Sequence, residues 1–352
     1  MTATARHCAF VSFRLGRTDG VSVVAAAWEQ ALRNLGWTTG RVAGDGDVDH
    51  LLPGLAIDAE EPPDEAALDA ALADADLVVV ENLLSIPLNL PASRVVAAVL
   101  AGRPTIVHHH DPPWQRERFA HVTELPVDDP AWHHVTINRL TEREFAERGL
   151  AATTVYNGFD TAPVPGRRAE TRRALGIDDE RPLAVHPVRA IARKDVPTAL
   201  AIAADLDAAY WLPGPAEEDY APVLDEVLAS TAQPVLRTTP AELDLSPAAT
   251  MSDLYAAADL VLFPSTWEGF GNPPMEAAVH RRPVVVGHYP VADELRALGF
   301  DWLDPDDGAG IAAAVAAPPT AMLDRNQELV EARFSLEVMA KGVEGVLAAA
   351  GF

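Results

Sequence analysis

Lysine, cysteine and long apolar stretches are all scarce in this chain of 352 residues. Lys194 and Lys341 are its two lysines, and 27 Lys and Arg face 52 Asp and Glu, for a formal net charge of −25. A field of this sign repels nucleic acid and anionic lipid surfaces, so we expect no nucleic-acid partner. The single cysteine, Cys8, cannot form an intrachain disulfide, which predicts a reducing, cytoplasmic location.

No apolar stretch approaches the length of about 20 residues that a membrane-spanning helix requires. The most apolar region, 77–100, is interrupted by Glu81, Pro87 and Arg94. The apolar segment near the N-terminus is too short for a signal peptide. We therefore expect no stable membrane insertion. A hydrophobic fraction of 49% in a chain of this length predicts a globular protein with room for two domains.

Strand-like and helix-like segments alternate along the chain. Short apolar runs predict strands at 7–13, 38–42, 77–80, 105–107, 134–138 and 153–156, and again at 183–188, 209–212, 260–263 and 283–287. Helical patterns fill most intervals, including 60–75, and a last amphipathic helix is expected at 335–350. No hairpin signal joins consecutive strands, so the predicted class is α/β, with doubly wound parallel sheets. The proline-containing segment 159–182 is the candidate linker.

Two carboxylates mark the stretch from 260 to 287. Glu268 lies in a loop after a predicted strand, and Glu276 follows after seven intervening residues. Pro273 and Pro274 suit the opening of a helix, which places Glu276 in its first turn. Loops at the carboxyl ends of parallel strands are where ligands bind in such sheets.

The residues between these carboxylates leave the backbone accessible. Gly269, Gly271 and Asn272 are small or polar, and a helix N-terminus favours a bound anion. The carboxylates could accept hydrogen bonds from sugar hydroxyls, and the neighbouring backbone amides could bind phosphate. This combination suits a sugar attached to a diphosphate. The alternative is that Glu276 only satisfies a helix start and that Glu268 is a solvated loop residue.

Basic residues follow the strand predicted at 183–188. Arg189 and Lys194 lie five residues apart in one loop, where both could bind a single anion. Charge-assisted hydrogen bonds to phosphate contribute about 1.5–3 kcal/mol each. A solvated basic loop is the alternative, but the scarcity of lysine in this chain favours a phosphate site.

A second candidate loop for phosphate follows the first strand. Gly20 and Asp19 lie between a predicted strand and a helix, which is a typical position for a phosphate-bearing ligand. Ordinary turn chemistry also accounts for a glycine there.

Three consecutive histidines, His108 to His110, end the strand predicted at 105–107. On a strand His108 and His110 share a face, and His109 points to the other side. With Asp111 they could hold zinc or iron, but no further spaced set of ligands completes such a site, so we predict no metal. We favour a substrate-facing polar edge of the sheet over a structural histidine cluster.

Together these motifs resemble the retaining glycosyltransferases of family 4, which have the GT-B fold. The resemblance covers nearly the full length. It is strongest in HPVRAIARKDVPTAL, LPGPAEEDY and LYAAADLVLFPSTWEGFGNPPMEAA, and weaker in TDGVSV, VHHHDPPWQR and VYNGFD. It implies two Rossmann-like domains facing across a cleft, namely an acceptor-binding domain at 1–165 and a nucleotide-sugar-binding domain at 166–334. The helix within 335–352 would pack back on the first domain, and a homodimer is compatible with this organisation.

The resemblance also implies roles for the residues that match the family motifs. Glu268 would hold hydroxyls of the donor sugar, and Glu276 would hold the ribose hydroxyls. Arg189 and Lys194 would bind the diphosphate and stabilise the leaving group, while His110 would lie near the reacting carbon. The remaining donor-binding residues would contact the donor mainly through their backbone groups. They are Gly20, Gly214, Gly269, Phe270, Gly271 and Asn272. The sequence departs from the family at Asp19-Gly20, where many members have two glycines.

The implied reaction is front-face substitution. The chain has no convincing pair of carboxylates for a double displacement, so a donor phosphate oxygen would accept the acceptor's proton. Arg189 and Lys194 would stabilise the charge on the departing diphosphate more in the transition state than in the ground state. No metal and no cofactor are therefore expected. The expected donor is a UDP-sugar, with a GDP-sugar next, and the transferred unit is hexosyl.

The acceptor is expected to be a soluble small molecule or oligosaccharide with a free hydroxyl, because the chain has no basic amphipathic helix. Its pocket would be shaped by loops after two strands, through Asn82, Ser85, Asp111, Trp114 and Arg116. Two alternatives remain, a sugar-nucleotide epimerase of the same architecture and a non-catalytic nucleotide-sugar-binding subunit.

Overall fold

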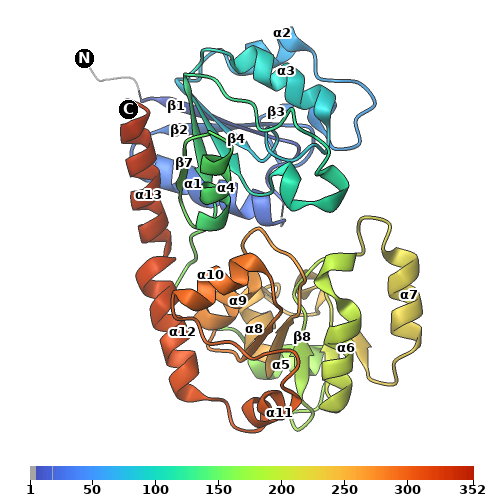
Figure 1. The fold of residues 1–352 in the computed structure, drawn as a ribbon. Helices are drawn as coiled ribbons and strands as arrows, with labels where there is room; N and C mark the ends of the chain where they lie inside the picture. The colour runs from blue at the N-terminus through green and yellow to red at the C-terminus, as the bar shows by residue number, and fades with distance from the viewer. Residues whose placement is uncertain (1–4, 18) are drawn as a thin grey trace. The chain divides into compact units, whose positions relative to one another are not determined.

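The computed structural model describes residues 5–17 and 19–352, which form two compact units. Unit 1 contains the described residues up to Gly158 together with Leu336–Phe352, and unit 2 contains Phe159–Ser335. Each unit is built on one parallel sheet covered by helices (Figure 1). The predicted α/β class with parallel sheets is confirmed. Thr18, part of the TDGVSV motif, lies outside the described residues.

The sheet of unit 1 has seven strands in the order β3-β2-β1-β4-β5-β6-β7. Its strands are β1 (His7–Ser12), β2 (Thr38–Ala43), β3 (His50–Leu51), β4 (Leu77–Glu81), β5 (Thr105–His109), β6 (Trp132–Thr136) and β7 (Ala152–Thr154). Its α-helices are α1 (Gly20–Asn34), α2 (Glu65–Ala71), α3 (Leu90–Leu100), α4 (Arg139–Glu147) and α13 (Leu336–Ala349). Short 3₁₀ turns are η1 (Pro53–Leu55), η2 (Pro113–Gln115) and η3 (Glu117–Phe119).

The two faces of this sheet bury separate cores, because successive strand residues point to opposite sides. Phe10 of β1 packs in the cluster that contains Trp28 of α1 and Val343 of α13. Its neighbour Val11 packs in the other cluster with Val96 of α3. The C-terminal helix α13 thus completes the core of unit 1 and runs beside α1 (Figure 1).

The sheet of unit 2 has five strands in the order β10-β9-β8-β11-β12. They are β8 (Leu183–Val185), β9 (Ala209–Trp211), β10 (Val235–Leu236), β11 (Leu260–Phe263) and β12 (Val284–Val286). The helices are α5 (Arg168–Ala174), α6 (Val196–Asp205), α7 (Ala221–Ala229), α8 (Met251–Ala257), α9 (Asn272–Val279), α10 (Pro290–Ala297), α11 (Gly308–Ala316) and α12 (Thr320–Arg333). The 3₁₀ turns are η4 (Ala192–Lys194) and η5 (Pro240–Glu242).

The predicted strands all occur, and the differences lie in helices and short edge strands. The helix expected at 60–75 begins only at Glu65, after two prolines and the cap Asp64. Helix α12 was not predicted, because its buried residues Leu323, Asn326 and Val330 are few among charged neighbours. The edge strands β3 and β10 have two residues each, too few for a hydrophobic pattern. Across the described residues, no helix is long and apolar enough to cross a membrane.

Candidate active site

Two of the predicted loops meet at one point of the unit 2 sheet. Strand β8 lies between β9 and β11, so the chain proceeds to one side of β8 and then returns to the other. Ligands of such sheets bind at the carboxyl ends of the strands where the order reverses. The loop after β8 ends at Lys194, and the loop after β11 contains Glu268. Thr266 N–H donates to the Arg193 carbonyl at 2.9 Å and ties the two loops together.

Glu268 holds two cations, one on each carboxylate oxygen. Lys194 Nζ lies 2.5 Å from Oε1, and Arg193 Nη1 lies 2.5 Å from Oε2. The Glu268 side chain is 8% exposed. Burial acts to raise its pKa, but Lys194 and Arg193 more than offset this effect and bring the pKa to about 2. The carboxylate is therefore ionised, and it can accept hydrogen bonds from hydroxyl groups.

Lys194 is a desolvated cation. Its ammonium lies 4.9 Å from the centroid of the Phe263 ring, and its side chain is 10% exposed. Burial lowers its pKa to about 8, against the opposing effect of Glu268. Nearby His186 is neutral, because burial and then Lys194 lower its pKa to about 3. A charge-assisted bond from such an ammonium to an anion is stronger than one made in bulk water.

Arg189 is held elsewhere in the same unit. Its guanidinium pairs with Glu217 Oε2 at 2.5 Å, in the loop after β9, and both side chains are about one-third exposed. The cation that joins Lys194 on Glu268 is Arg193, which the sequence analysis did not single out. Its position next to Lys194 in the RAIARKD segment is the sequence feature that could have indicated this role. An anion that binds Arg189 must compete with Glu217.

Gly214 allows the loop after β9 to pass directly over the loop after β8. A Cβ atom there would lie 2.0 Å from the Val188 carbonyl oxygen. The Gly214 carbonyl accepts a hydrogen bond from Arg237 Nη2 at 2.5 Å. Close backbone packing therefore accounts for this glycine, and its contact with a donor stays a prediction.

Glu276 lies one residue further into its helix than predicted. Helix α9 begins at Asn272, with Gly271 as its N-cap, so Glu276 is beyond the first turn. The prediction was wrong because the helix starts one residue before the two prolines. Tyr255 donates its hydroxyl to Glu276 Oε2 at 2.5 Å. Burial raises the pKa of Glu276, and the hydrogen bond from Tyr255 opposes that shift.

The loop between the two glutamates is shaped by a glycine and an aromatic anchor. Gly271 has φ +101°, and a Cβ there would lie 2.6 Å from the Tyr289 hydroxyl oxygen. Phe270 is 3% exposed, and its ring stacks on Phe159 with centroids 6.1 Å apart. The Phe270 side chain therefore belongs to the core of unit 2. Gly269 and Asn272 flank these two residues in the same loop and helix start.

In unit 1, the candidate loop for phosphate precedes α1. Asp19 caps this helix, accepting from Ser22 N–H at 3.3 Å and from Ser22 Oγ at 2.8 Å. Gly20 is the first helical residue, and a Cβ there would meet no described atom within 4 Å. Packing therefore does not require this glycine.

The histidine triplet divides between the two faces of its sheet, as predicted. His108 Nδ1 lies 3.1 Å from Glu81, and His110 Nε2 lies 2.8 Å from Glu81 Oε2. On the opposite face, His109 Nε2 bonds His134 Nδ1 at 2.8 Å. Complete burial acts to raise the pKa of Glu81, but His108 and then His110 bring it to about 2.

The structure corrects the ligand set weighed for a metal. Glu81, His108 and His110 bring three possible ligand atoms within 4.8 Å of one another, whereas Asp111 is not in the group. Asp111 pairs instead with Arg116. The hydrogen bonds from both imidazoles to Glu81 already explain the close approach of the three side chains.

The side chains of the two predicted acceptor residues after β4 bond to backbone groups and to a buried side chain. Asn82 has φ +59°, and its Oδ1 accepts the N–H groups of His110 and Asp111, both at 3.1 Å. It therefore fixes the segment that carries His110. Ser85 is fully buried and its hydroxyl bonds His109, so contact with an acceptor would require that bond to open.

Trp114 is held from two sides after β5. Its indole N–H donates to Glu144 Oε2 at 2.8 Å, and the Arg148 guanidinium lies 3.9 Å from its ring centroid. The guanidinium of Arg116 forms an ion pair with Asp111. Contacts with other side chains of unit 1 thus position both predicted acceptor residues.

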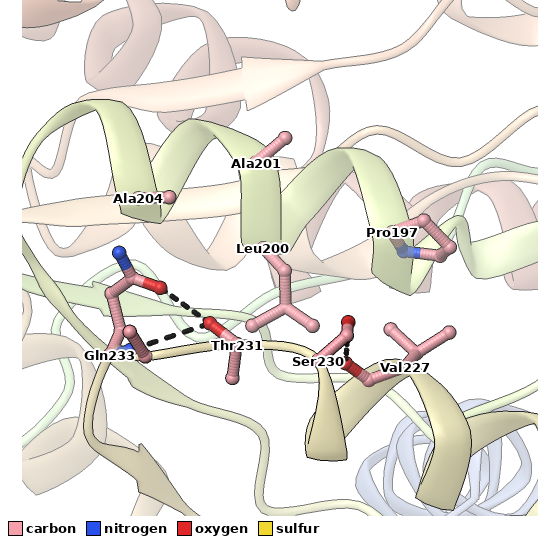
Figure 2. Close-up of a pocket in the computed structure, with 9 residues that line it drawn as sticks. Pro197, Leu200, Ala201, Ala204, Val227, Ser230, Thr231 and Gln233 are labelled. Atoms are coloured by element: carbon pink, nitrogen blue, oxygen red, sulfur yellow. Dashed lines mark hydrogen bonds between the residues drawn. The ribbon is translucent and has the colours of Figure 1, made fainter.

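A separate hollow of about 370 Å³ lies against α6 and α7 (Figure 2). Its lining includes Leu200, Val227 and Thr231, and Thr231 is bonded to Gln233. None of the predicted site residues lines this hollow.

Sequence comparison identifies the class of enzyme. Residues 201–317 match the family model described as glycosyl transferases group 1. Mannosylglucosylglycerate synthase of Petrotoga mobilis is 26% identical over 374 residues, covering 83% of this chain and 84% of that protein. The protein of the same name from Thermotoga maritima is 25% identical, with 85% and 84% covered.

Structural comparison supports the same assignment of the fold. The structure of Anabaena Alr3699/HepE in complex with UDP and glucose has a TM-score of 0.74 at 16% identity, covering 98% of this chain and all of that one. WaaG, a glycosyltransferase involved in lipopolysaccharide biosynthesis, has a TM-score of 0.68 at 13% identity, with 96% and 98% covered. The chain has the GT-B fold and is similar to the glycosyltransferases of group 1, family GT4. This finding favours the transferase over the epimerase and the non-catalytic subunit.

Proposed function

We propose that the protein transfers a hexosyl unit, with retention, from a nucleoside diphosphate sugar to a hydroxyl group of a soluble acceptor. The observation that carries the proposal is the cluster of Glu268, Lys194 and Arg193 at the carboxyl ends of β8 and β11. It combines a buried, ionised carboxylate with desolvated cations, which suits the two chemically different ends of such a donor.

Glu268 and Lys194 of the cluster, together with Arg189 and Glu276, have distinct tasks in this proposal. Glu268 accepts hydrogen bonds from the sugar hydroxyls, and Lys194 binds the diphosphate. Arg189 joins Lys194 on the diphosphate after leaving Glu217. Cations fixed near the departing oxygens stabilise charge that develops only in the transition state, which accelerates the chemical step. Glu276 binds the ribose hydroxyls through its second oxygen, while Tyr255 holds the first.

The acceptor's proton passes to a phosphate oxygen of the departing diphosphate. The C–O bond to the diphosphate breaks as the acceptor oxygen bonds to the same face of the sugar. Arg189 and Lys194 supply the positive charge that the step requires, so no metal takes part. The family resemblance assigns His110 to the neighbourhood of the reacting carbon.

The donor is proposed to be a UDP-sugar, with a GDP-sugar next. The Anabaena structure in complex with UDP and glucose supports the first choice. The names of the two relatives describe synthesis of mannosylglucosylglycerate, which favours a small, soluble acceptor and puts mannosyl donors in the test.

The first experiment measures nucleoside diphosphate release from UDP-, GDP- and ADP-sugars in the presence of EDTA, with and without glucosylglycerate as acceptor. Release from one donor would identify the nucleotide and show independence from divalent metal. Lys194→Met is expected to lower release about 10²- to 10³-fold, as when a preorganised charge-stabilising donor is removed. Lys341→Met, at the chain's other lysine, is the matched control and should retain wild-type release.

The possible outcomes of this experiment lead to different conclusions. The proposal would be contradicted if no donor released a nucleoside diphosphate and no nucleotide raised the unfolding temperature of the protein. An isomerised nucleotide sugar in place of free nucleoside diphosphate would contradict transfer as the reaction. Equal activity of the Lys194 and Lys341 variants would remove Lys194 from the leaving-group role.

A further inference from the structure

The buried carboxylate of Glu81 lies beside His110, and no lysine or arginine among the described residues pairs with it. Glu81 and His108 are 0% exposed, and the His110 side chain is 6% exposed. Within the part of the chain that the structure describes, the ion pairs of Glu81 are with these two histidines and with no lysine or arginine. Burying a charge without a full partner is costly, so such a group is seldom retained for packing alone.

Strand register and a backbone clamp bring these side chains together. Glu81 of β4 is directly paired with His108 of β5 in the parallel ladder. His110 follows two residues later on the same face, and Asn82 Oδ1 holds its N–H at 3.1 Å. The rings of His108 and His110 lie 4.7 Å apart, and Trp28 packs 4.4 Å from His108. The imidazole of His110 therefore has little freedom to turn.

The hydrogen bonds determine which ring nitrogens carry protons. A carboxylate only accepts, so both His108 Nδ1 and His110 Nε2 must donate to Glu81. An imidazole in its neutral form has one N–H, so a neutral ring that donates to Glu81 keeps its other nitrogen as an acceptor. His108 Nε2 is buried and bonds no described group. His110 Nδ1 is consequently the acceptor that this cluster can offer to a substrate hydroxyl.

We propose that Glu81 is a positioning residue for the transfer reaction: it fixes His110 in the Nε2–H tautomer and so presents Nδ1 as an acceptor for a substrate hydroxyl. The proposal rests on the proposed function for its kinetic consequence, while the tautomer assignment stands on its own. A carboxylate that holds one imidazole nitrogen also increases the basicity of the other. His108 shares the carboxylate and keeps it from rotating toward another partner.

The groups that face Glu81 come from two strands. His108 lies on β5 and His110 directly follows the end of that strand, and Cys8 of β1 has its pKa raised by burial and then by the charges of Glu29 and Glu81. Burial lowers the pKa of His108 in spite of Glu81, so its ring is neutral at pH 7. The protonation of the cluster is thus that of a carboxylate with two N–H donors.

The experiment combines ¹⁵N NMR of histidine-labelled protein with kinetics of Glu81→Gln. In the wild type we expect the Nε2 of His110 to be protonated and its Nδ1 to have the shift of an unprotonated nitrogen. In Glu81→Gln the amide can donate or accept, so the His110 signals should shift toward a mixture of tautomers. We expect kcat to fall about 10- to 100-fold, as for loss of the group that orients a functional imidazole, with little change in donor KM.

Glu29→Gln is the matched control, because Glu29 is also 0% exposed in unit 1 but pairs with Arg33 and Arg41. It should lower the unfolding temperature and leave kcat, its pH profile and the His110 shifts unchanged. Protonation of His110 on Nδ1 in the wild type, or identical kinetics for the two variants, would overturn the proposal. If the wild type turns over no donor, the proposed function fails, whereas the nitrogen shifts of the wild type still decide whether Glu81 fixes the tautomer.

Discussion

Lys194 Nζ lies 2.5 Å from Glu268 Oε1, so the two side chains proposed to hold opposite ends of the donor also bond to each other. A diphosphate that binds Lys194 must compete with this carboxylate. If Lys194 turned to a phosphate, as the proposed function requires, Glu268 would gain an oxygen for sugar hydroxyls and would remain ionised through Arg193. Donor binding would then exchange one ion pair for two interactions with substrate.

Activity should fall at alkaline pH because Lys194 loses its charge. The folded-state pKa of about 8 lies below the ordinary value of 10.5, so kcat/KM for the donor should fall about tenfold per pH unit above about 8. Stability should show the opposite trend. Between these two pKa values the unfolded chain binds more protons, so the contribution of Lys194 to the free energy of unfolding rises with pH. Lys194→Arg, which stays charged, should move the activity decline to higher pH.

Glu268→Gln should cost both stability and activity. The substitution leaves Lys194 and Arg193 without a balancing carboxylate, and breaking such a buried pair costs about 3 kcal/mol or more. The pKa of Lys194 should also fall further. Urea unfolding and donor hydrolysis measure the two effects. Glu217→Gln is the control for stability, because its ion pair with Arg189 is one-third exposed and should contribute about 0–1 kcal/mol. Equal losses of stability in the two variants would contradict the central role of Glu268.

Gly20→Ala tests whether the first turn of α1 approaches the donor. No described atom lies within 4 Å of the added Cβ, so the unfolding temperature should not fall. If a phosphate lies against this backbone, donor KM should rise. Gly308 is the matched control, since it is likewise the first residue of a helix, follows an aspartate cap and has nothing within 4 Å. A donor KM unchanged in both alanine variants would exclude Gly20 from the donor site.

Tyr255→Phe should weaken nucleotide binding through Glu276. Loss of the hydroxyl leaves a carboxylate oxygen unpaired and lets burial raise the pKa of Glu276 further. An unsatisfied buried acceptor costs about 1–3 kcal/mol, measurable by urea unfolding. Donor KM should rise in Tyr255→Phe and change little more when the substitution is added to Glu276→Gln. Additive effects in this cycle would show that Tyr255 acts independently of Glu276.

Much of this protein could be predicted from local sequence patterns. Apolar β-branched runs defined the parallel strands, since a buried strand needs a continuous apolar stretch. The alternation along Thr105–Asp111 placed His108 and His110 on one face and His109 on the other. The motif spacing singled out Glu268 and Lys194, which the structure joins at 2.5 Å. Helix α12 and the start of α9 were harder to predict from the sequence. Helix α12 has few buried residues, and α9 begins after an unusual glycine cap, so both give weak sequence signals.

The pairings within the candidate sites were decided by the tertiary structure. Arg193 rather than Arg189 joins Lys194 on Glu268, because a 3₁₀ turn before α6 directs both neighbours at one carboxylate. Glu81 reaches His108 and His110 because β4 and β5, separated by a helix in the chain, lie side by side in register. Sequence by itself determines local periodicity and residue chemistry. Which charges are buried together, and therefore which pKa values shift and which nitrogens carry protons, depends on strand order and loop packing that no single segment encodes.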